Sequence, residues 1–200
     1  MERRSTHSAK VILEHRGEDN KPVIAGLGAV YYDGTPDTEY ELWEGVRERI
    51  MPGAFDGVMD NDVRGLFNHD PSQVLGRTSA GTMKLRADKK GLHYEIDPGD
   101  TSVARDVLEH LRRGDVSGSS FAFSISDEEW RKEDGVEIRE ITGFKALYDT
   151  GPVTYPAYET TTAGVRSAGG DGEARASYEA WKHRAEYEAT RAKIDATRRW

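Results

Sequence analysis

The sequence predicts a mainly β, mixed α+β domain that ends near residue 160. Short apolar segments separated by glycine, proline, asparagine and aspartate recur along the chain, as in proteins built from many short strands. One segment, residues 101–113, instead repeats its apolar residues at three- and four-residue steps, which indicates an amphipathic helix. A chain of 200 residues is long enough for one sizeable core, so we expect a β-barrel or an α+β domain.

The predicted elements follow from local patterns of alternation and turn residues. Two strands are expected within residues 10–32, one on each side of a turn at 17–21, and a hairpin is expected from strands at 83–85 and 92–96. Further strands are expected at 40–50, at 63–68, beginning at 74, and at 116–125, 136–142 and 144–150. A short helix is expected at 54–60. The longer helix begins after the capping residue Asp100 or Thr101 and ends at Gly114.

The composition changes after residue 162. Residues 163–172 are rich in glycine and other small residues, which predicts a flexible linker. Residues 173–200 predict a helical tail with one apolar stripe, formed by Tyr178, Trp181, Ala185, Ala189, Ala192, Ala196 and Trp200. The tail is interpreted as an interaction element that packs through this stripe, the alternative being a poorly ordered end.

Charge and cysteine content exclude several classes of function. The tail holds seven Lys/Arg and five Asp/Glu, so its net charge is +2. The whole chain has a net charge of −8, so residues 1–172 carry −10. An acidic body argues against nucleic acid as the main partner. The absence of cysteine excludes disulfides, thiolate metal sites and cysteine nucleophiles. No apolar run is long enough to span a membrane and no secretory signal is visible, so a cytoplasmic setting is expected.

Two segments carry residues suited to nucleophilic catalysis. Leu66–Asp70 (LFNHD) contains His69, and Asp115–Phe123 (DVSGSSFAF) contains three serines. A serine hydroxyl is a weak nucleophile until a neighbouring base takes its proton. Both segments are expected in strands, and only folding could bring them together. Each segment taken alone is better explained as ordinary structure than as part of a catalytic site.

Strand alternation separates the two adjacent serines. In an extended strand Ser119 shares the face of Phe121 and Phe123, whereas Ser120 lies on the other face. If the phenylalanines point into the core, Ser120 is the serine that points away from it. Asp149, at a strand end, could orient a histidine, although taken alone it is better explained as a solvent-facing turn aspartate.

The neighbours His69 and Asp70 also suggest a different chemistry, the metal-binding dyad of phosphohydrolases. Such a site needs further histidine ligands. His93 and His110 are the other candidates in the body of the protein.

Five short motifs occur in a fixed order along the chain. They are Met51–Phe55 (MPGAF), Leu66–Asp70 (LFNHD), Leu75–Thr78 (LGRT), Gly114–Gly118 (GDVSG) followed by Ser120 and Phe121, and Val153–Tyr158 (VTYPAY). Together they resemble the prohead maturation proteases of tailed phages, the HK97-type family, which is distantly similar to the herpesvirus assemblins. The resemblance spans residues 10–162, which places the protease domain at 1–162.

The resemblance implies a serine endopeptidase on a small closed or partly closed β-barrel flanked by a few helices, with no metal or cofactor. Its histidine corresponds to His69, its nucleophile to Ser120, and its third member to Asp149. Relatives often carry glutamate at the third position and methionine before the nucleophile, and this chain departs from both. The oxyanion site is expected at backbone amides near Gly118 or at a water held by Arg77.

The resemblance also implies the partners. The substrates would be the scaffold portion of the major capsid protein and the protease itself, inside the immature capsid in the host cytoplasm. The tail would dock the protease in the shell or be removed by self-cleavage. Because assemblins are activated by dimerisation, a homodimer is one implied state. Two alternatives remain open at this point, a catalytically inactive assembly or scaffolding module with a protease fold, and the metal phosphohydrolase.

Overall fold

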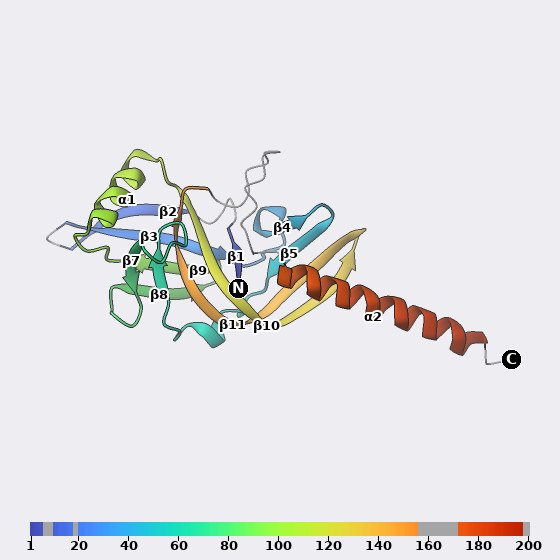
Figure 1. Ribbon diagram of the computed structural model, residues 1–200. Coiled ribbons are helices and arrows are strands. Elements are labelled where there is room, and N and C mark those ends of the chain that lie inside the picture. Colours follow the sequence, from blue (N-terminus) through green and yellow to red (C-terminus); the bar gives the residue numbers. More distant parts are fainter. Residues whose placement is uncertain (6–9, 18–19, 156–171, 198–200) are drawn as a thin grey trace.

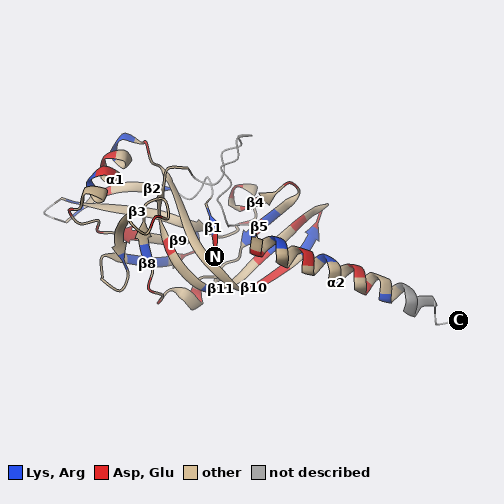
Figure 2. Cartoon of the chain, viewed as in Figure 1, with Lys and Arg blue, Asp and Glu red and all other residues tan. Residues whose placement is uncertain are grey.

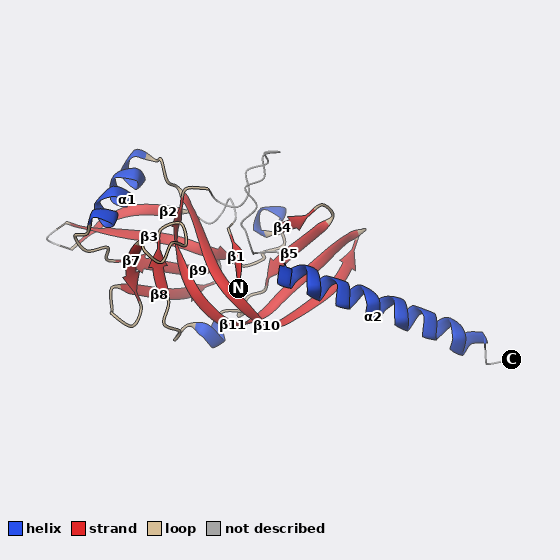
Figure 3. Cartoon of the chain, viewed as in Figure 1, coloured by secondary structure: helices blue, strands red, loops and turns tan. Residues whose placement is uncertain are grey.

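The computed structural model describes residues 1–5, 10–17, 20–155 and 172–197. Strands dominate the described part, and two α-helices accompany them (Figure 3), which confirms the predicted mixed, mainly β class. The strands form two sheets (Figure 1). Buried side chains from both sheets belong to one hydrophobic core.

The two sheets are open. The larger has the order β1-β10-β11-β5-β4, with β6 and β7 added beside the last part of β11, and the smaller has the order β2-β3-β9-β8. Their bounds are β1 Glu2–Arg4, β2 Val11–Arg16, β3 Lys21–Val30, β4 Tyr40–Trp43, β5 Val46–Ile50, β6 Arg64–Leu66, β7 Val74–Arg77, β8 Met83–Asp88, β9 Gly91–Ile96, β10 Gly118–Glu133 and β11 Val136–Val153. The resemblance implied a closed or partly closed barrel. Within the described residues neither sheet closes, so the closed form of that prediction is wrong. The first part of β11 pairs with β5 and its last part with β6, so the larger sheet divides instead of curling back on itself.

Strands β10 and β11 form one long antiparallel hairpin instead of the three shorter strands predicted. Asp134 and Gly135 join them with φ values of 49° and 86°, as two-residue hairpin turns require. The register between β10 and β11 shifts several times between Ala122 and Glu128. Such bulges bend a strand and change which face its side chains occupy. The apolar alternation is therefore interrupted although the chain stays extended.

Several predicted elements are confirmed. Strands β2, β3, β8 and β9 fall in the predicted segments. Helix α1 spans Ser102–Arg113, and the Thr101 side chain accepts a hydrogen bond from the Ala104 amide at 3.1 Å. Gly114 ends the helix with a left-handed φ of 80°, the conformation for which glycine is favoured.

Two segments differ from the prediction. The single strand expected at 40–50 is a hairpin of β4 and β5, turned at Gly45. The helix expected at 54–60 is one turn of 3₁₀ helix, Asp56–Val58. The Ala54 carbonyl accepts a hydrogen bond from the Phe144 amide on β11 (3.1 Å), so the sheet uses an acceptor that a helix would need.

Aromatic packing fixes which face of β10 points inward. Phe121 and Phe123 are fully buried and stack with a centroid separation of 4.8 Å. Phe55 and Phe144 stack at 4.4 Å beside them. Buried aromatic rings contribute a large share of core stability because each removes much apolar area from water. Residues on alternate positions of β10 therefore point away from this core.

A buried ion cluster attaches the first strand to the sheet. Glu2 and Arg4 on β1 meet Glu48 on β5 and Arg139 on β11, and each of the four side chains is at most 3% exposed. Arg4 Nε donates to Glu48 at 2.7 Å, and Arg139 Nη1 donates to Glu2 and Glu48 at 2.8 and 2.9 Å. Burial alone would lower the pKa of Arg139, but the facing carboxylates raise it, so the guanidinium stays charged.

Removing one carboxylate from this cluster is expected to destabilise the fold. Glu48→Gln leaves two buried guanidinium groups short of a charge partner, and breaking a buried pair typically costs about 3–5 kcal/mol. Denaturant unfolding measures the loss. Glu41→Gln on neighbouring β4, where the side chain is exposed, is the matched control and should stay within about 0.5 kcal/mol of the parent. Equal unfolding midpoints for both variants would contradict the claim that the buried guanidinium groups depend on Glu48 for their charge balance.

The C-terminal helix α2 spans Gly172–Thr197 and extends away from the body (Figure 1). Near its start, Tyr178 and Trp181 pack against Trp130 of β10, and Tyr178 also contacts Trp43. Positive and negative side chains are interspersed along the described part of α2 (Figure 2). Residues 163–171 of the predicted linker lie outside the described residues. No described helix is long and apolar enough to cross a bilayer.

Candidate active site

Ser120 lies on β10, on the opposite side from the phenylalanine core. Its neighbour Ser119 is fully buried on the core side, where its hydroxyl hydrogen-bonds the Tyr94 hydroxyl at 2.6 Å. Burial raises the pKa of Tyr94, so the phenol keeps its proton. The two serine hydroxyls therefore have different surroundings, and only that of Ser120 has a base beside it.

Asp149 reaches the same region from β11. It lies opposite Ala122 in the β10–β11 register, two residues along from the pair of Ser120 with Gly151. Its neighbour Thr150 is fully buried and donates a hydrogen bond from its hydroxyl to the Ser120 carbonyl at 3.0 Å. The central hairpin therefore fixes the distance between the serine and the carboxylate.

His69 lies in a tight turn after β6, so its predicted place on a strand face is wrong. Asn68 and His69 have φ values of 55° and 57°, a left-handed conformation in which asparagine and histidine are enriched among non-glycine residues. The turn brings the imidazole back over the ends of β10 and β11. Gly151 allows this close approach, because a Cβ there would stand 2.2 Å from the Leu66 carbonyl oxygen.

The residues on either side of His69 fasten its turn. The Asn68 amide donates to the Pro152 carbonyl at 3.0 Å, and its side-chain oxygen accepts from the Thr154 amide at 2.8 Å. Asp70 accepts hydrogen bonds from the Ser72 amide, the Ser72 hydroxyl and the Gln73 side chain at 2.6–2.9 Å. In the Asn-His-Asp motif, the outer two side chains therefore hold the backbone that carries His69.

The hydrogen bonds to Asp70 predict a pH-dependent contribution to stability. The Ser72 hydroxyl, then Gln73 and the Ser72 amide, lower the pKa of Asp70 below its ordinary value. A depressed carboxyl pKa stabilises the fold above the unfolded-state value of about 3.9, and this stabilisation is lost as pH falls through the lower folded-state value. The difference in melting temperature between wild type and Asp70→Asn should therefore shrink on acidification. A difference that is constant from pH 7 to pH 2 would contradict this role.

His69, Ser120 and Asp149 form one continuous hydrogen-bonded chain. Nε2 of His69 lies 2.7 Å from the Ser120 hydroxyl oxygen, and Nδ1 contacts Oδ1 of Asp149. The three side chains come from positions that are 51 and 80 residues apart in the sequence. The side chains of His69 and Asp149 are 10% and 8% exposed. A proton on Nδ1 directed at the carboxylate leaves the lone pair of Nε2 free to accept the serine proton.

The Ser120 hydroxyl has a second partner that sequence reasoning missed. Its oxygen lies 2.9 Å from the carbonyl oxygen of Arg4 on β1. The first residues of the chain are polar and charged, with no apolar alternation, so their pattern gives no sign of a strand. The roles of Thr150 and Tyr94 were also missed, because a buried hydroxyl partner leaves no periodic signal.

The two residues considered for an oxyanion site lie in different places. Gly118 is buried on β10, two positions before Ser120, and pairs with Val153. Arg77 lies on β7, where its guanidinium binds the carboxylate of Asp62, with an Nε–Oδ1 distance of 2.8 Å. Only Gly118 therefore shares a strand with the serine.

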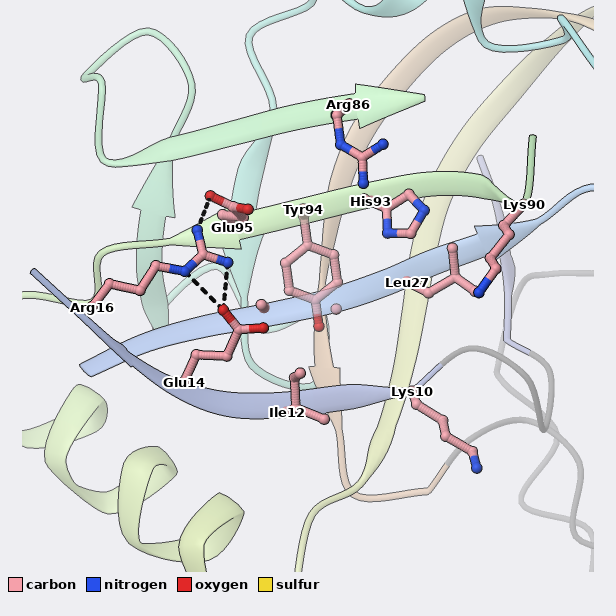
Figure 4. Close-up of a pocket in the computed structure, with 12 residues that line it drawn as sticks. Lys10, Ile12, Glu14, Arg16, Leu27, Arg86, Lys90, His93, Tyr94 and Glu95 are labelled. Atoms are coloured by element: carbon pink, nitrogen blue, oxygen red, sulfur yellow. Dashed lines mark hydrogen bonds and ion pairs between the residues drawn. The ribbon is translucent and has the colours of Figure 1, made fainter. Parts of the chain in front are cut away.

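A separate groove lies over β2, β3 and β9 (Figure 4). Its volume is about 350 Å³, and none of His69, Ser120 and Asp149 lines it. Arg16 is held between Glu14 and Glu95 at one end of the groove. Tyr94 also lines the groove, and its hydroxyl reaches Ser119.

The histidines considered as metal ligands are dispersed. His93 on β9 contacts Asp88 on β8 at 3.0 Å, and His110 on α1 contacts Asp115 at 3.5 Å. Within the residues that the structure describes, no group of three or more histidine, aspartate or glutamate side chains is placed to hold a metal ion.

Comparison with known proteins connects this geometry to one family. The sequence model of the family described as "Caudovirus prohead serine protease" matches residues 9–173. No curated protein and no solved structure matches the chain significantly. The matched region contains all three residues of the hydrogen-bonded chain and most of both sheets. The chain therefore belongs to the caudovirus prohead serine protease family, whose members are hydrolases of phage capsid maturation.

Proposed function

We propose that the protein is a serine endopeptidase in which Ser120 is the nucleophile, His69 the general base and Asp149 the residue that orients the histidine. One observation carries this proposal, the unbroken series of hydrogen bonds from the Ser120 hydroxyl through the imidazole to the Asp149 carboxylate. A serine, a base and an orienting carboxylate within hydrogen-bond reach are the signature of an activated nucleophile.

The proposed reaction begins when the Ser120 oxygen attacks a peptide carbonyl carbon. His69 takes the hydroxyl proton on Nε2 as the new C–O bond forms. It then gives this proton to the leaving amine, and the C–N bond breaks to leave an acyl-enzyme. In the second half of the reaction, His69 takes a proton from a water molecule that attacks the ester carbon. It then gives this proton to the Ser120 oxygen as the ester C–O bond breaks. Asp149 holds the imidazole in the productive tautomer and stabilises the imidazolium that forms.

The developing oxyanion needs donors aimed at it, because such donors commonly supply several kcal/mol of transition-state stabilisation. Of the two candidates, backbone amides near Gly118 are better supported, since they share β10 with Ser120. The Arg77 guanidinium is already bound to Asp62. A water held by Arg77 would have to compete with that ion pair.

We further propose that the substrates are the scaffold portion of the major capsid protein and the protease itself, cleaved inside the immature capsid. The family supports a capsid protein as substrate. In this proposal the tail after residue 162 docks the protease in the shell or is removed by self-cleavage. Within the described part of the tail, the body holds only the start of α2, through Tyr178 and Trp181, and Tyr187 further along is 66% exposed. That exposed length is available for a partner, a second copy of the chain included.

Incubation of the purified protein with its cognate major capsid protein tests the proposal. We expect loss of a terminal scaffold fragment, detected by intact mass, that a serine-directed phosphonate blocks and a metal chelator does not affect. An intact capsid protein despite phosphonate modification of Ser120 would refute the proposed substrate. An intact capsid protein together with no modification would favour an inactive assembly module. Loss of cleavage with chelator would favour the metal-dependent alternative.

A further inference from the structure

The first strand of the chain lies directly against the proposed nucleophile. Strand β1 pairs antiparallel with β10, with Arg3 opposite Ala122 and Arg4 opposite Phe121. The next residue, Ser5, is fully buried. The Arg4 carbonyl oxygen is 2.9 Å from the Ser120 hydroxyl oxygen. A peptide backbone therefore already occupies the position beside the serine.

This contact gives the proton of the Ser120 hydroxyl a second possible acceptor besides His69. A hydroxyl has one proton to donate, and two acceptors compete for it here, the Arg4 carbonyl at 2.9 Å and His69 Nε2 at 2.7 Å. A carbonyl oxygen can only accept. Whenever the proton is directed at Arg4, it is not directed at the base, and the serine is not activated.

The same strand removes the space that a substrate would need. Ser120 is 5% exposed, with β11 paired on one side of β10 and β1 on the other. Neighbouring strands lie about 4.8 Å apart, so a further strand outside β1 would be about twice that distance from β10. Attack requires the reacting atoms to be about 3–3.5 Å apart. A substrate strand reaches the serine from this side only if β1 leaves.

We propose that the edge of β10 beside Ser120 is the binding site for the extended substrate peptide, and that β1 occupies this site as a resident peptide which keeps the protease off. This inference rests on the proposed function, because it concerns the same serine. Activation is then the departure of β1 from β10. The peptide that replaces it adds a strand to the exposed edge, with main-chain hydrogen bonds providing affinity.

The ion cluster binds β1 to the sheet. It also determines which side-chain charge a replacing peptide should carry. Arg4 inserts between Glu2 and Glu48, which accept from it at 2.5 and 2.7 Å. Arg139 also donates from Nε to Glu128 on β10 at 2.7 Å. When β1 departs it takes Glu2 and Arg4 with it, and Glu48, Glu128 and Arg139 remain with a net charge of −1. The vacated position therefore suits a peptide with a basic side chain at the place of Arg4. Buried ion pairs often contribute little net stability because desolvation offsets their attraction, which makes an exchange of strands feasible.

A reversible lock on β1 tests the proposal. The chain has no cysteine, so the double variant Arg3→Cys/Ala122→Cys can form only one intramolecular disulfide. Directly opposite residues have Cα atoms about 4.5–5.5 Å apart, within the range that a disulfide spans. The readout is the rate at which a fluorophosphonate modifies Ser120. Lys132→Cys/Glu137→Cys, an opposed pair near the hairpin tip, is the matched control.

We expect oxidation of Arg3→Cys/Ala122→Cys to slow modification roughly tenfold or more, since the rate scales with the fraction of molecules whose site is open. Reduction should restore the rate, and oxidation of the control pair should not change it. A chain that begins at residue 6 should react faster than wild type if it folds. Equal rates for the oxidised and reduced lock would overturn the inference while leaving the proposed function intact. No modification in any form, wild type included, would overturn the proposed function and this inference with it.

Discussion

Ser120→Ala is expected to abolish peptide cleavage while leaving the protein folded. The substitution removes the attacking oxygen, and loss of a serine nucleophile typically lowers kcat by about 10⁴–10⁶-fold. The side chain makes hydrogen bonds to His69 and Arg4 only through its hydroxyl, so alanine fits the same space. Cleavage of the cognate capsid protein, followed over time by intact mass, measures the loss, and the melting temperature verifies the fold.

Ser119→Ala is the matched control on the neighbouring position. Its hydroxyl serves Tyr94 on the core side, so we expect retained cleavage with a stability loss of about 1–3 kcal/mol from the unpaired Tyr94 hydroxyl. Equal cleavage by wild type and Ser120→Ala would contradict the assignment. Loss in Ser119→Ala alone would move the nucleophile by one residue.

Asp149→Asn is expected to lower kcat by about 10⁴-fold, the effect that losing the orienting carboxylate has in a serine triad. An amide can donate to Nδ1 and so stabilise the tautomer that carries its proton on Nε2. That tautomer cannot accept the Ser120 proton. The imidazolium would also lose the carboxylate that it contacts through Nδ1. Steady-state cleavage of a reporter peptide derived from the capsid protein gives the change in kcat.

Asp149→Glu tests whether the negative charge or the exact side-chain length at this position matters more. It keeps the negative charge that the imidazolium needs, so we expect it to retain more activity than Asp149→Asn despite the added methylene. Similar activity of Asp149→Asn and wild type would remove Asp149 from the mechanism. Loss of activity in both variants together with a lower melting temperature would indicate a structural role.

The parts of the fold that the sequence predicts are those governed by local chemistry. The Thr101 cap and the Gly114 terminus bound α1 because both act through backbone groups within one turn. The alternation of Ser119, Ser120 and Phe121 gave the correct face for each side chain because β10 is still regular at that point. Sheet closure depends on pairings between distant strands, and alternation within one strand does not encode them.

The same distinction between local and long-range determinants applies to the candidate site. The motif order indicated His69, Ser120 and Asp149 together, and the structure brings all three side chains into contact. The turn that carries His69 was assigned to a strand because Asn68 and His69 follow an apolar segment, and their positive φ has no signature in periodicity. Strand β1 was missed because Glu2 and Arg4 are charged, and charged side chains are buried only when distant partners such as Glu48 neutralise them.

The most direct test of the central claim is to map the residue that a serine-directed fluorophosphonate modifies in the wild-type protein. After prolonged exposure, tandem mass spectrometry of a digest should locate one adduct, on Ser120, and His69→Ala should abolish it because the hydroxyl then has no base. An adduct on Ser119, or an adduct on Ser120 that forms equally fast in His69→Ala, would contradict the account.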